Sequence, residues 1–188
     1  SRSASGVPGP AYWQQRADYT IEAVLDEDER TILGRAVITY TNNSPEALDY
    51  LWVHLEQNLF RPESAGALSV DPGTRFGYRE GTQGGMEVRS VRAEGRELPH
   101  RVYDTLMRGD LPEPLAPGGD RLTFEITWTF RIPPFGADRL GMEDLGQGVV
   151  FQLAQWFPAV AKYDDVNGWN AMPYLGQGEF YTDFGDYD

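Results

Sequence analysis

LTFEITWTFRI, the stretch from Leu122 to Ile132, alternates apolar and polar residues without a break. Successive side chains of a β-strand point to opposite faces, so this period of two predicts a strand with one face in a core and the other in water. Pro133 and Pro134 should end the strand, because neither can donate a backbone hydrogen bond. We expect six side chains to face the core: Leu122, Phe124, Ile126, Trp128, Phe130 and Ile132.

Three earlier segments, residues 18–25, 32–41 and 51–55, show the same alternation or a run of β-branched and aromatic residues. Charged and Asn/Ser/Pro turns separate them, so the simplest arrangement is a meander of three antiparallel strands. No repeat, long helix or linker between domains interrupts the pattern. We therefore expect an all-β fold, an antiparallel or mixed β-sandwich.

Two segments rich in glycine and proline predict loops. Arg61 to Gly85 contains six glycines and has little periodicity, so we expect a long irregular segment that exchanges its amides quickly. Asp110 to Asp120 contains three prolines and two glycines, and it should be a loop that leads into the long strand.

Charge and composition exclude several classes of protein. The 188 residues carry a formal net charge of -13, which disfavours binding to nucleic acid and to anionic membrane surfaces. The acidity either keeps the protein in solution or attracts cationic ligands such as peptide amines. No apolar run approaches the ~20 residues of a membrane helix.

Cysteine is absent, so neither disulfides nor thiolate metal sites can form. The two histidines, His54 and His100, cannot supply an H-E-x-x-H motif, so we expect no metal and no catalytic residue in this chain. Residues 1–11 are small, polar and bear Gly and Pro, and we expect a flexible lead before a domain over residues 12–188.

Two groups of residues have a functional and a structural interpretation. Asp164, Asp165, Asn167 and Gly168 offer oxygen ligands for calcium, but an Asx turn explains them as well, since the EF-hand order is incomplete. Trp156 and Trp169 lie in predicted loops. Their rings either stack on a bound sugar or pack against other side chains of the domain.

Three segments together resemble the N-terminal domain of aminopeptidase N-like (gluzincin) zinc metallopeptidases. The first two are Gly34 to Tyr40 with the strand that follows, and the entry Leu115-Ala116-Pro117-Gly118-Gly119-Asp120 to the long strand. The third is similar to a bacterial branch of the family: Ala154-Gln155-Trp156-Phe157-Pro158, Tyr163-Asp164-Asp165, Gly168-Trp169 and Gly178-Glu179-Phe180-Tyr181.

The resemblance implies a saddle-like, β-rich domain that packs on a thermolysin-like catalytic domain of the same chain and stops before it. The zinc motif H-E-x-x-H and the amine-binding G-x-M-E-N strand do not occur here, so zinc is expected only in the full-length protein. In the family this domain lends one Gln to the site of the substrate's free amine. Gln155 is the preferred match because it lies inside the A-Q-W-F-P run, and Gln152 is the alternative.

The function we expect is therefore that of a non-catalytic domain, which walls the active-site cleft and helps to bind the peptide N-terminus. The alternative is a stand-alone carbohydrate- or protein-binding β-sandwich module. The compartment is open, although the bacterial resemblance favours a secreted or periplasmic protein.

Overall fold

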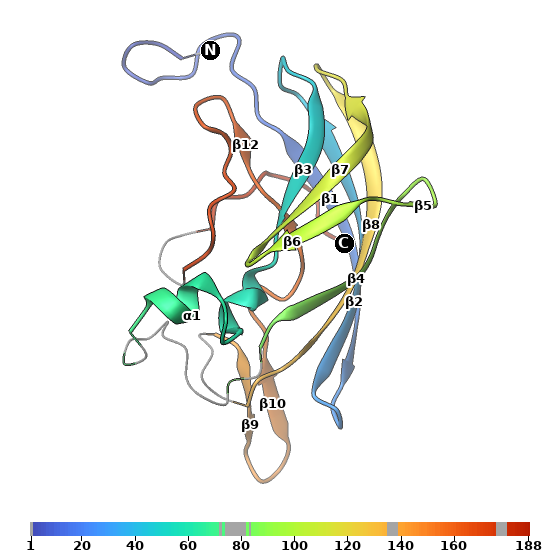
Figure 1. Cartoon of the computed structure of the whole chain (residues 1–188), viewed down its shortest axis with the longest axis vertical. Helices are drawn as coiled ribbons and strands as arrows, with labels where there is room; N and C mark the ends of the chain where they lie inside the picture. Colours follow the sequence, from blue (N-terminus) through green and yellow to red (C-terminus); the bar gives the residue numbers. More distant parts are fainter. Residues whose placement is uncertain (1, 72, 74–81, 83, 135–138, 176–179) are drawn as a thin grey trace.

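The predicted long strand lies at the centre of a five-stranded antiparallel sheet in the computed structural model (Figure 1). The structure describes residues 2–71, 73, 82, 84–134, 139–175 and 180–188. The sheet order is β1 (Arg16–Asp26), β2 (Thr31–Asn42), β8 (Asp120–Arg131), β4 (Met86–Ala93) and β5 (Arg96–Glu97).

Strand β8 buries the face that its alternation predicts. Phe124, Ile126, Trp128 and Phe130 are at most 3% exposed, and Ile132, just beyond the strand, is 0% exposed. Leu122 is partly buried and packs against the same core. The predicted inward face is therefore confirmed, with Leu122 at its margin.

A second sheet lies across the core from the first and has the order β11 (Ala159–Val160), β3 (Leu48–His54), β7 (Leu106–Leu115) and β6 (His100–Tyr103). Leu51, Val53 and Met107 of this sheet are buried in one cluster with Ile38 and Phe124 of the first. Two antiparallel sheets that share a core make the fold all-β and sandwich-like, as predicted.

The predicted three-strand meander is wrong at its third strand. β3 pairs with β7 and β11 and not with β2, because both edges of β2 are taken by β1 and β8. The buried Asn42 makes the turn that changes sheets. Its Oδ1 accepts from the Ser44 hydroxyl at 2.6 Å, and its Nδ2 donates to the carbonyl of Glu46 at 2.8 Å and to that of Leu115 at 3.0 Å.

Most of the loop predicted at residues 110–120 is strand, since β7 runs to Leu115. Its prolines, Pro112 and Pro114, fall where the pairing with β3 changes register, between the Leu48–Leu115 and Tyr50–Asp110 partners. A proline has no N–H, so its presence is tolerated where the ladder is already interrupted.

The segment predicted as irregular from Arg61 to Gly85 follows η1 (Glu56–Phe60) and contains the short helix α1 (Ala65–Ser69). The Ser64 hydroxyl caps α1 by accepting from the Ala67 N–H at 2.9 Å. The prediction is therefore wrong for α1, and residues 72, 74–81 and 83 lie outside the described residues. No helix in the described part of the chain is long and apolar enough to span a membrane.

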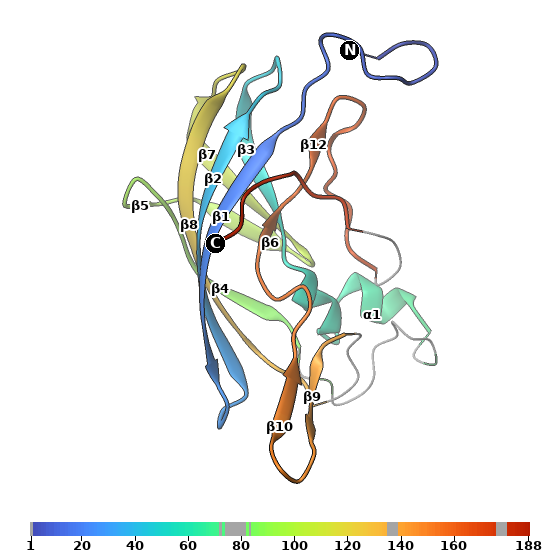
Figure 2. The same cartoon turned by 180° about the vertical axis from the view of Figure 1, so that it is seen from behind.

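The C-terminal part of the chain, from β9 onward, lies beside the second sheet and α1 (Figure 2). It contains two hairpins, β9 (Gly141–Asp144) with β10 (Val149–Gln152), and β12 (Tyr163–Asp164) with β13 (Gly168–Trp169). Residues 184–188 then run parallel to the edge strand β1, where the N–H of Ala17 donates to the carbonyl of Phe184 at 3.1 Å and that of Ile21 to Asp188 at 2.8 Å.

Candidate functional site

Gln155 lies in the loop between β10 and β11, and its backbone has the left-handed conformation with φ of 48°. The Nε2 of Gln57, a residue that is 0% exposed, donates to the carbonyl of Ala154 at 2.7 Å and to that of Gln155 at 3.1 Å. A non-glycine residue adopts this conformation only when its surroundings enforce it. The Gln57 amide therefore clamps the backbone of Gln155 in place.

The side chain of Gln155 is partly exposed and makes no hydrogen bond within the described residues. Next to it, the Trp128 indole N–H donates to the carbonyl of Trp156 at 3.0 Å. The rings of Trp156 and Phe157 pack edge to face, 5.4 Å between centroids. The backbone is therefore anchored to the core on both sides of Gln155, while the side-chain amide of Gln155 remains available for hydrogen bonding.

Gln152 has a different setting. It is exposed at the end of β10, where it pairs with Gly141 of β9. Nothing anchors its side chain among the described residues. The two candidate glutamines thus differ in setting, and hydrogen bonds from Gln57 hold the backbone of Gln155 but not that of Gln152.

Both tryptophans predicted in loops pack against the core, Trp156 from a loop and Trp169 from β13. Trp156 lies 6.2 Å from Trp128 between ring centroids, and Trp169 lies 5.1 Å from Tyr163. These contacts match the packing interpretation of both residues.

The acidic cluster forms the predicted Asx turn. The Oδ1 of Asp164 accepts from the N–H groups of Val166 at 2.9 Å and Asn167 at 2.7 Å, and its Oδ2 accepts from the Asn170 amide at 2.9 Å. Burial opposes the charged form of Asp164, yet these hydrogen bonds together lower its pKa. Asp165 pairs with Arg2 at 2.9 Å. The carboxylates are thus engaged within the protein.

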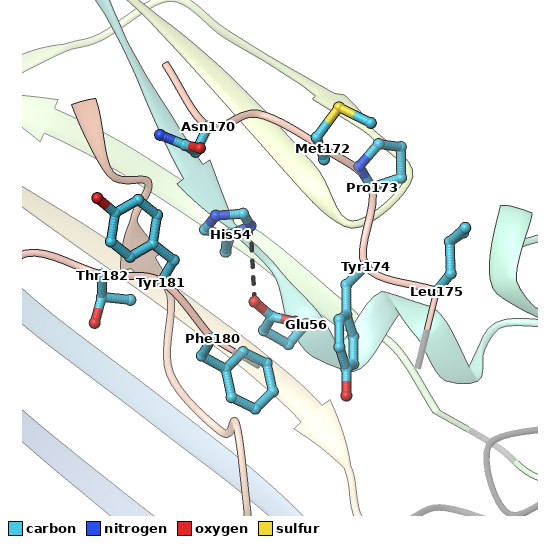
Figure 3. A pocket seen from close by; sticks show the side chains of 10 residues that line it. All are labelled: His54, Glu56, Asn170, Met172, Pro173, Tyr174, Leu175, Phe180, Tyr181 and Thr182. Atoms are coloured by element: carbon cyan, nitrogen blue, oxygen red, sulfur yellow. Dashed lines mark ion pairs between the residues drawn. The ribbon is translucent and has the colours of Figure 1, made fainter. Parts of the chain in front are cut away.

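A cavity of about 280 Å³ lies between the end of β3, the start of η1 and the segment that follows β13 (Figure 3). His54 and Glu56 supply its ionisable wall, and the His54 Nδ1 is 3.7 Å from the Glu56 Oε1. The other lining residues are Asn170, Met172, Pro173, Tyr174, Leu175, Phe180, Tyr181 and Thr182.

Burial controls the charges in this cavity. It raises the pKa of Glu56 to about 7 and lowers that of His54, because neither charged form is well solvated there. The His54 Nδ1 and the Glu56 Oε2 are buried, and neither has a hydrogen-bond partner among the described residues. The sequence alone does not reveal this pair, because the alternation of β3 places His54 on the face away from the core.

Among the residues that the structure describes, no three His, Asp or Glu side chains gather closely enough to hold a metal ion. His100 lies on the exposed strand β6, with its Nδ1 3.0 Å from the carbonyl of Leu98, and His54 is on β3. The two histidines therefore belong to different sites.

No family model matches the chain, and no curated protein matches it. Among solved structures, the chain is similar to the M1 zinc metallopeptidase from Deinococcus radiodurans, with 15% identity over 63% of this chain and 20% of that one, at a TM-score of 0.40. A mutant of that enzyme bound to a Tyr-Ser-Ala substrate gives 13% identity, 93% and 31% coverage and a TM-score of 0.43.

A GH20 exo-β-N-acetylglucosaminidase from Vibrio harveyi gives 13% identity, 89% and 20% coverage and a TM-score of 0.32. The chain spans less than a third of the length of each of these proteins. Identities of 13–15% and TM-scores below 0.5 mark a distant similarity.

Proposed function

We propose that this chain is the non-catalytic N-terminal domain of a zinc aminopeptidase-like metallopeptidase, that it walls one side of the active-site cleft, and that Gln155 helps to bind the substrate's free α-amine. The sequence segments that resemble this family support the proposal. The observation that carries it is the clamp on the Gln155 loop: a buried amide from Gln57 holds the backbone, and the Gln155 side chain is left without a partner among the described residues.

The chemistry of the task fits an amide at this position. A free α-ammonium group offers only hydrogen-bond donors, so its site needs carbonyl or carboxylate acceptors. The amide oxygen of Gln155 orients the ammonium without adding a second buried charge. The partner carboxylate belongs to the catalytic domain, so the amine site forms only in the assembled protein.

The hydrogen bonds from Gln57 also order the backbone of the Gln155 loop before substrate binds. A left-handed residue costs of order 1–3 kcal/mol unless its neighbours hold it. Two hydrogen bonds from Gln57 and one from Trp128 to the next carbonyl supply that support. A pre-ordered backbone lowers the ordering cost when substrate binds, because only the Gln155 side chain remains to be fixed.

The side chains that the structure describes do not fit a catalytic zinc site. Zinc in a peptidase needs three closely placed ligands and an open position, whereas His54 and His100 lie on different strands. Peptide hydrolysis would therefore depend on residues of the catalytic domain. The 188-residue chain should hydrolyse no aminoacyl substrate, and stoichiometric zinc in chelator-washed protein, with loss of fold on its removal, would contradict this assignment.

The test is the kinetics of the full-length protein on a peptide with a free N-terminus. Gln155→Ala should lower kcat/KM by roughly 5- to 150-fold, which corresponds to about 1–3 kcal/mol for a charged group that loses its partner. Gln155→Asn is the matched variant, because Asn tolerates the left-handed conformation but reaches less far. N-acetylated peptides should be poor substrates for all forms.

Gln152→Ala is the control, since Gln152 is the exposed alternative on β10. If only Gln152→Ala is impaired, the role belongs to Gln152. If neither glutamine affects kcat/KM, the assignment of amine binding to this domain is wrong. The alternative of a stand-alone carbohydrate-binding module has less support, because Trp156 and Trp169 are used in packing.

A further inference from the structure

Glu56 is a buried carboxylate that no described residue neutralises, because the His54 ring, 3.7 Å from its Oε1, has a lowered pKa. The residue is 8% exposed, and its Oε2 makes no hydrogen bond to any described residue. Its backbone cannot swing outward freely, because the N–H of Leu55 donates to the carbonyl of Thr105 at 2.8 Å and the N–H of Asn58 to that of Leu55 at 2.9 Å. A carboxylate held in this way is costly unless a cation or a donor completes its surroundings.

Two further acceptors line the same cavity. Burial lowers the pKa of His54, so its ring is neutral near pH 7 and one ring nitrogen is an acceptor. The side-chain amide of Asn170 donates from its Nδ2 to the Oδ2 of Asp164 at 2.9 Å. Its side-chain oxygen, Oδ1, remains available as an acceptor. In Figure 3 this oxygen is drawn on the side of His54.

The remaining walls are aromatic and apolar. Tyr174 and Phe180 pack with ring centroids 5.1 Å apart, and Tyr181 and Leu175 complete the lining. The ring of Tyr181 already has the ammonium of Lys162 at 5.6 Å from its centroid. Faces of aromatic rings attract organic cations, and the apolar side chains suit an alkyl stem.

We propose that this cavity binds a primary alkylammonium group, either the end of a lysine side chain or a free alkylamine. The Glu56 carboxylate supplies the charge, the His54 ring and the Asn170 carbonyl supply acceptors, and the aromatic wall encloses the alkyl chain. The inference goes beyond the proposed function, because it uses neither Gln155 nor the amine site assigned to it. A net charge of -13 favours the approach of such a cation at low ionic strength.

The chain itself provides a specific probe, because it has only two histidines. Imidazole ¹H–¹⁵N correlation spectra of the 188-residue chain report on His54 in the cavity and on His100, on β6, as an internal control. We expect n-butylamine in phosphate buffer at pH 8 to shift the His54 signals saturably, with a Kd on the order of millimolar for so small a ligand. The His100 signals should not change, and n-butanol, the neutral counterpart, should have no effect.

Protons compete with the cation for Glu56. With a pKa of about 7, Glu56 is mostly ionised at pH 8 and mostly protonated at pH 6, so the apparent affinity should fall about tenfold between them. The alkylamine is charged at both values. Among the described residues, the other titratable groups around the cavity are His54 on β3 and Tyr174 and Tyr181, which follow β13, with Lys162 beside Tyr181 and paired with Asp183 at 2.6 Å.

Glu56→Gln preserves the shape of the side chain and should weaken butylamine binding at least tenfold at pH 8. Glu87→Gln, on an exposed position of β4, is matched for net charge and should bind as the parent does. N-acetyl-lysine methylamide, compared with butylamine, tests whether the site recognises a lysine side chain of a peptide or a free alkylamine. Tighter binding than butylamine assigns the site to a peptide lysine, and weaker binding assigns it to a free amine.

The proposal is overturned if butylamine gives no saturable shift at His54 up to about 100 mM, well beyond the affinity expected for such a ligand. It is also overturned if butanol acts as butylamine does, if Glu56→Gln binds normally, or if Zn²⁺ binds and butylamine does not. Should Glu56→Gln fail to fold, the comparison of pH 6 with pH 8 on the parent chain decides the question, because binding that is equal at both excludes Glu56.

Discussion

Gly34→Ala is the substitution that most directly tests how the core is built. Gly34 on β2 pairs with Trp128 on β8, and the indole lies over the glycine. A Cβ added at residue 34 would overlap the indole atoms Cε2 and Cζ2 and lie 2.8 Å from Cη2. Trp128 is 1% exposed and donates its N–H to the carbonyl of Trp156 at 3.0 Å. The indole therefore has no free space into which it can move.

Two effects oppose each other in this variant. Replacing a strand glycine by alanine stabilises by about 0.5–1 kcal/mol, because the unfolded chain loses freedom. Forcing a methyl group into a filled core costs about 1–3 kcal/mol, and displacement of the indole removes a hydrogen bond worth about 0.5–1.5 kcal/mol. Packing should win, and we expect a net destabilisation of about 2 kcal/mol.

Urea unfolding followed by tryptophan fluorescence measures this value. Gly109→Ala on β7 is the matched control, because its added Cβ would meet only the Leu98 Cδ2, at 3.3 Å, the movable end of a side chain. Its free energy of unfolding should stay within about 1 kcal/mol of the parent.

The packing argument is tested most directly by introducing Gly34→Ala into a Trp128→Phe variant. Phenylalanine lacks the outer part of the indole that the new methyl group would overlap, so Gly34→Ala should be nearly neutral there. The double-mutant cycle should give a coupling energy of at least about 1 kcal/mol. Additive effects, or a Gly34→Ala variant as stable as the parent, would refute the packing argument.

Three further predictions concern the core, the cavity and the C-terminal edge. Phe124→Ala should destabilise by about 3–5 kcal/mol through lost burial and a cavity, and a variant that melts like the parent would show that β8 is misassigned. For Glu56, a rise of the pKa from 4.5 to about 7 means that the folded state binds the proton more tightly, so stability should fall by about 3 kcal/mol as the pH rises through that window. Burial also raises the pKa of Asp183 to about 6, so part of the fall in stability remains in Glu56→Gln. Urea titrations at pH 5 and pH 8 should therefore show a larger loss in the parent than in Glu56→Gln. Gly185→Ala should detach residues 184–188 from β1, because the added Cβ would overlap the carbonyl oxygen of Ala17. Amide exchange should then quicken at Ile21, whose N–H donates to Asp188, while the amides of β8 stay protected.

Several local features of the protein were predictable because their causes lie within a few residues. The period of two in Leu122–Ile132 reports which face of β8 is buried, since each side chain's direction follows from its neighbours. The hairpin turn at Glu94 and Gly95 has both residues at positive φ, the conformation that two-residue hairpin turns favour. The Asx turn at Asp164 follows from a side chain that bonds to its own nearby backbone.

The candidate site was predictable only in part. Gln155 was selected through a family resemblance, whereas the clamp that makes its position distinctive comes from Gln57, 98 residues away. The cavity of His54 and Glu56 is closed by residues 170–175 and 180–182, and no spacing in the sequence links these segments.

By itself, the sequence determined that the chain is all-β, which face of β8 is buried and where the tight turns form. Tertiary structure alone decided that β3 belongs to the second sheet, that Pro112 and Pro114 are tolerated within β7, and that the Glu56 Oε2 is buried with no hydrogen-bond partner among the described residues. The reason is physical: every residue except proline offers the same backbone donor and acceptor to a neighbouring strand, so alternation specifies the face of a strand but not its neighbour. The neighbour, and with it the surroundings of Glu56 and Gln155, is chosen by the packing of the whole chain.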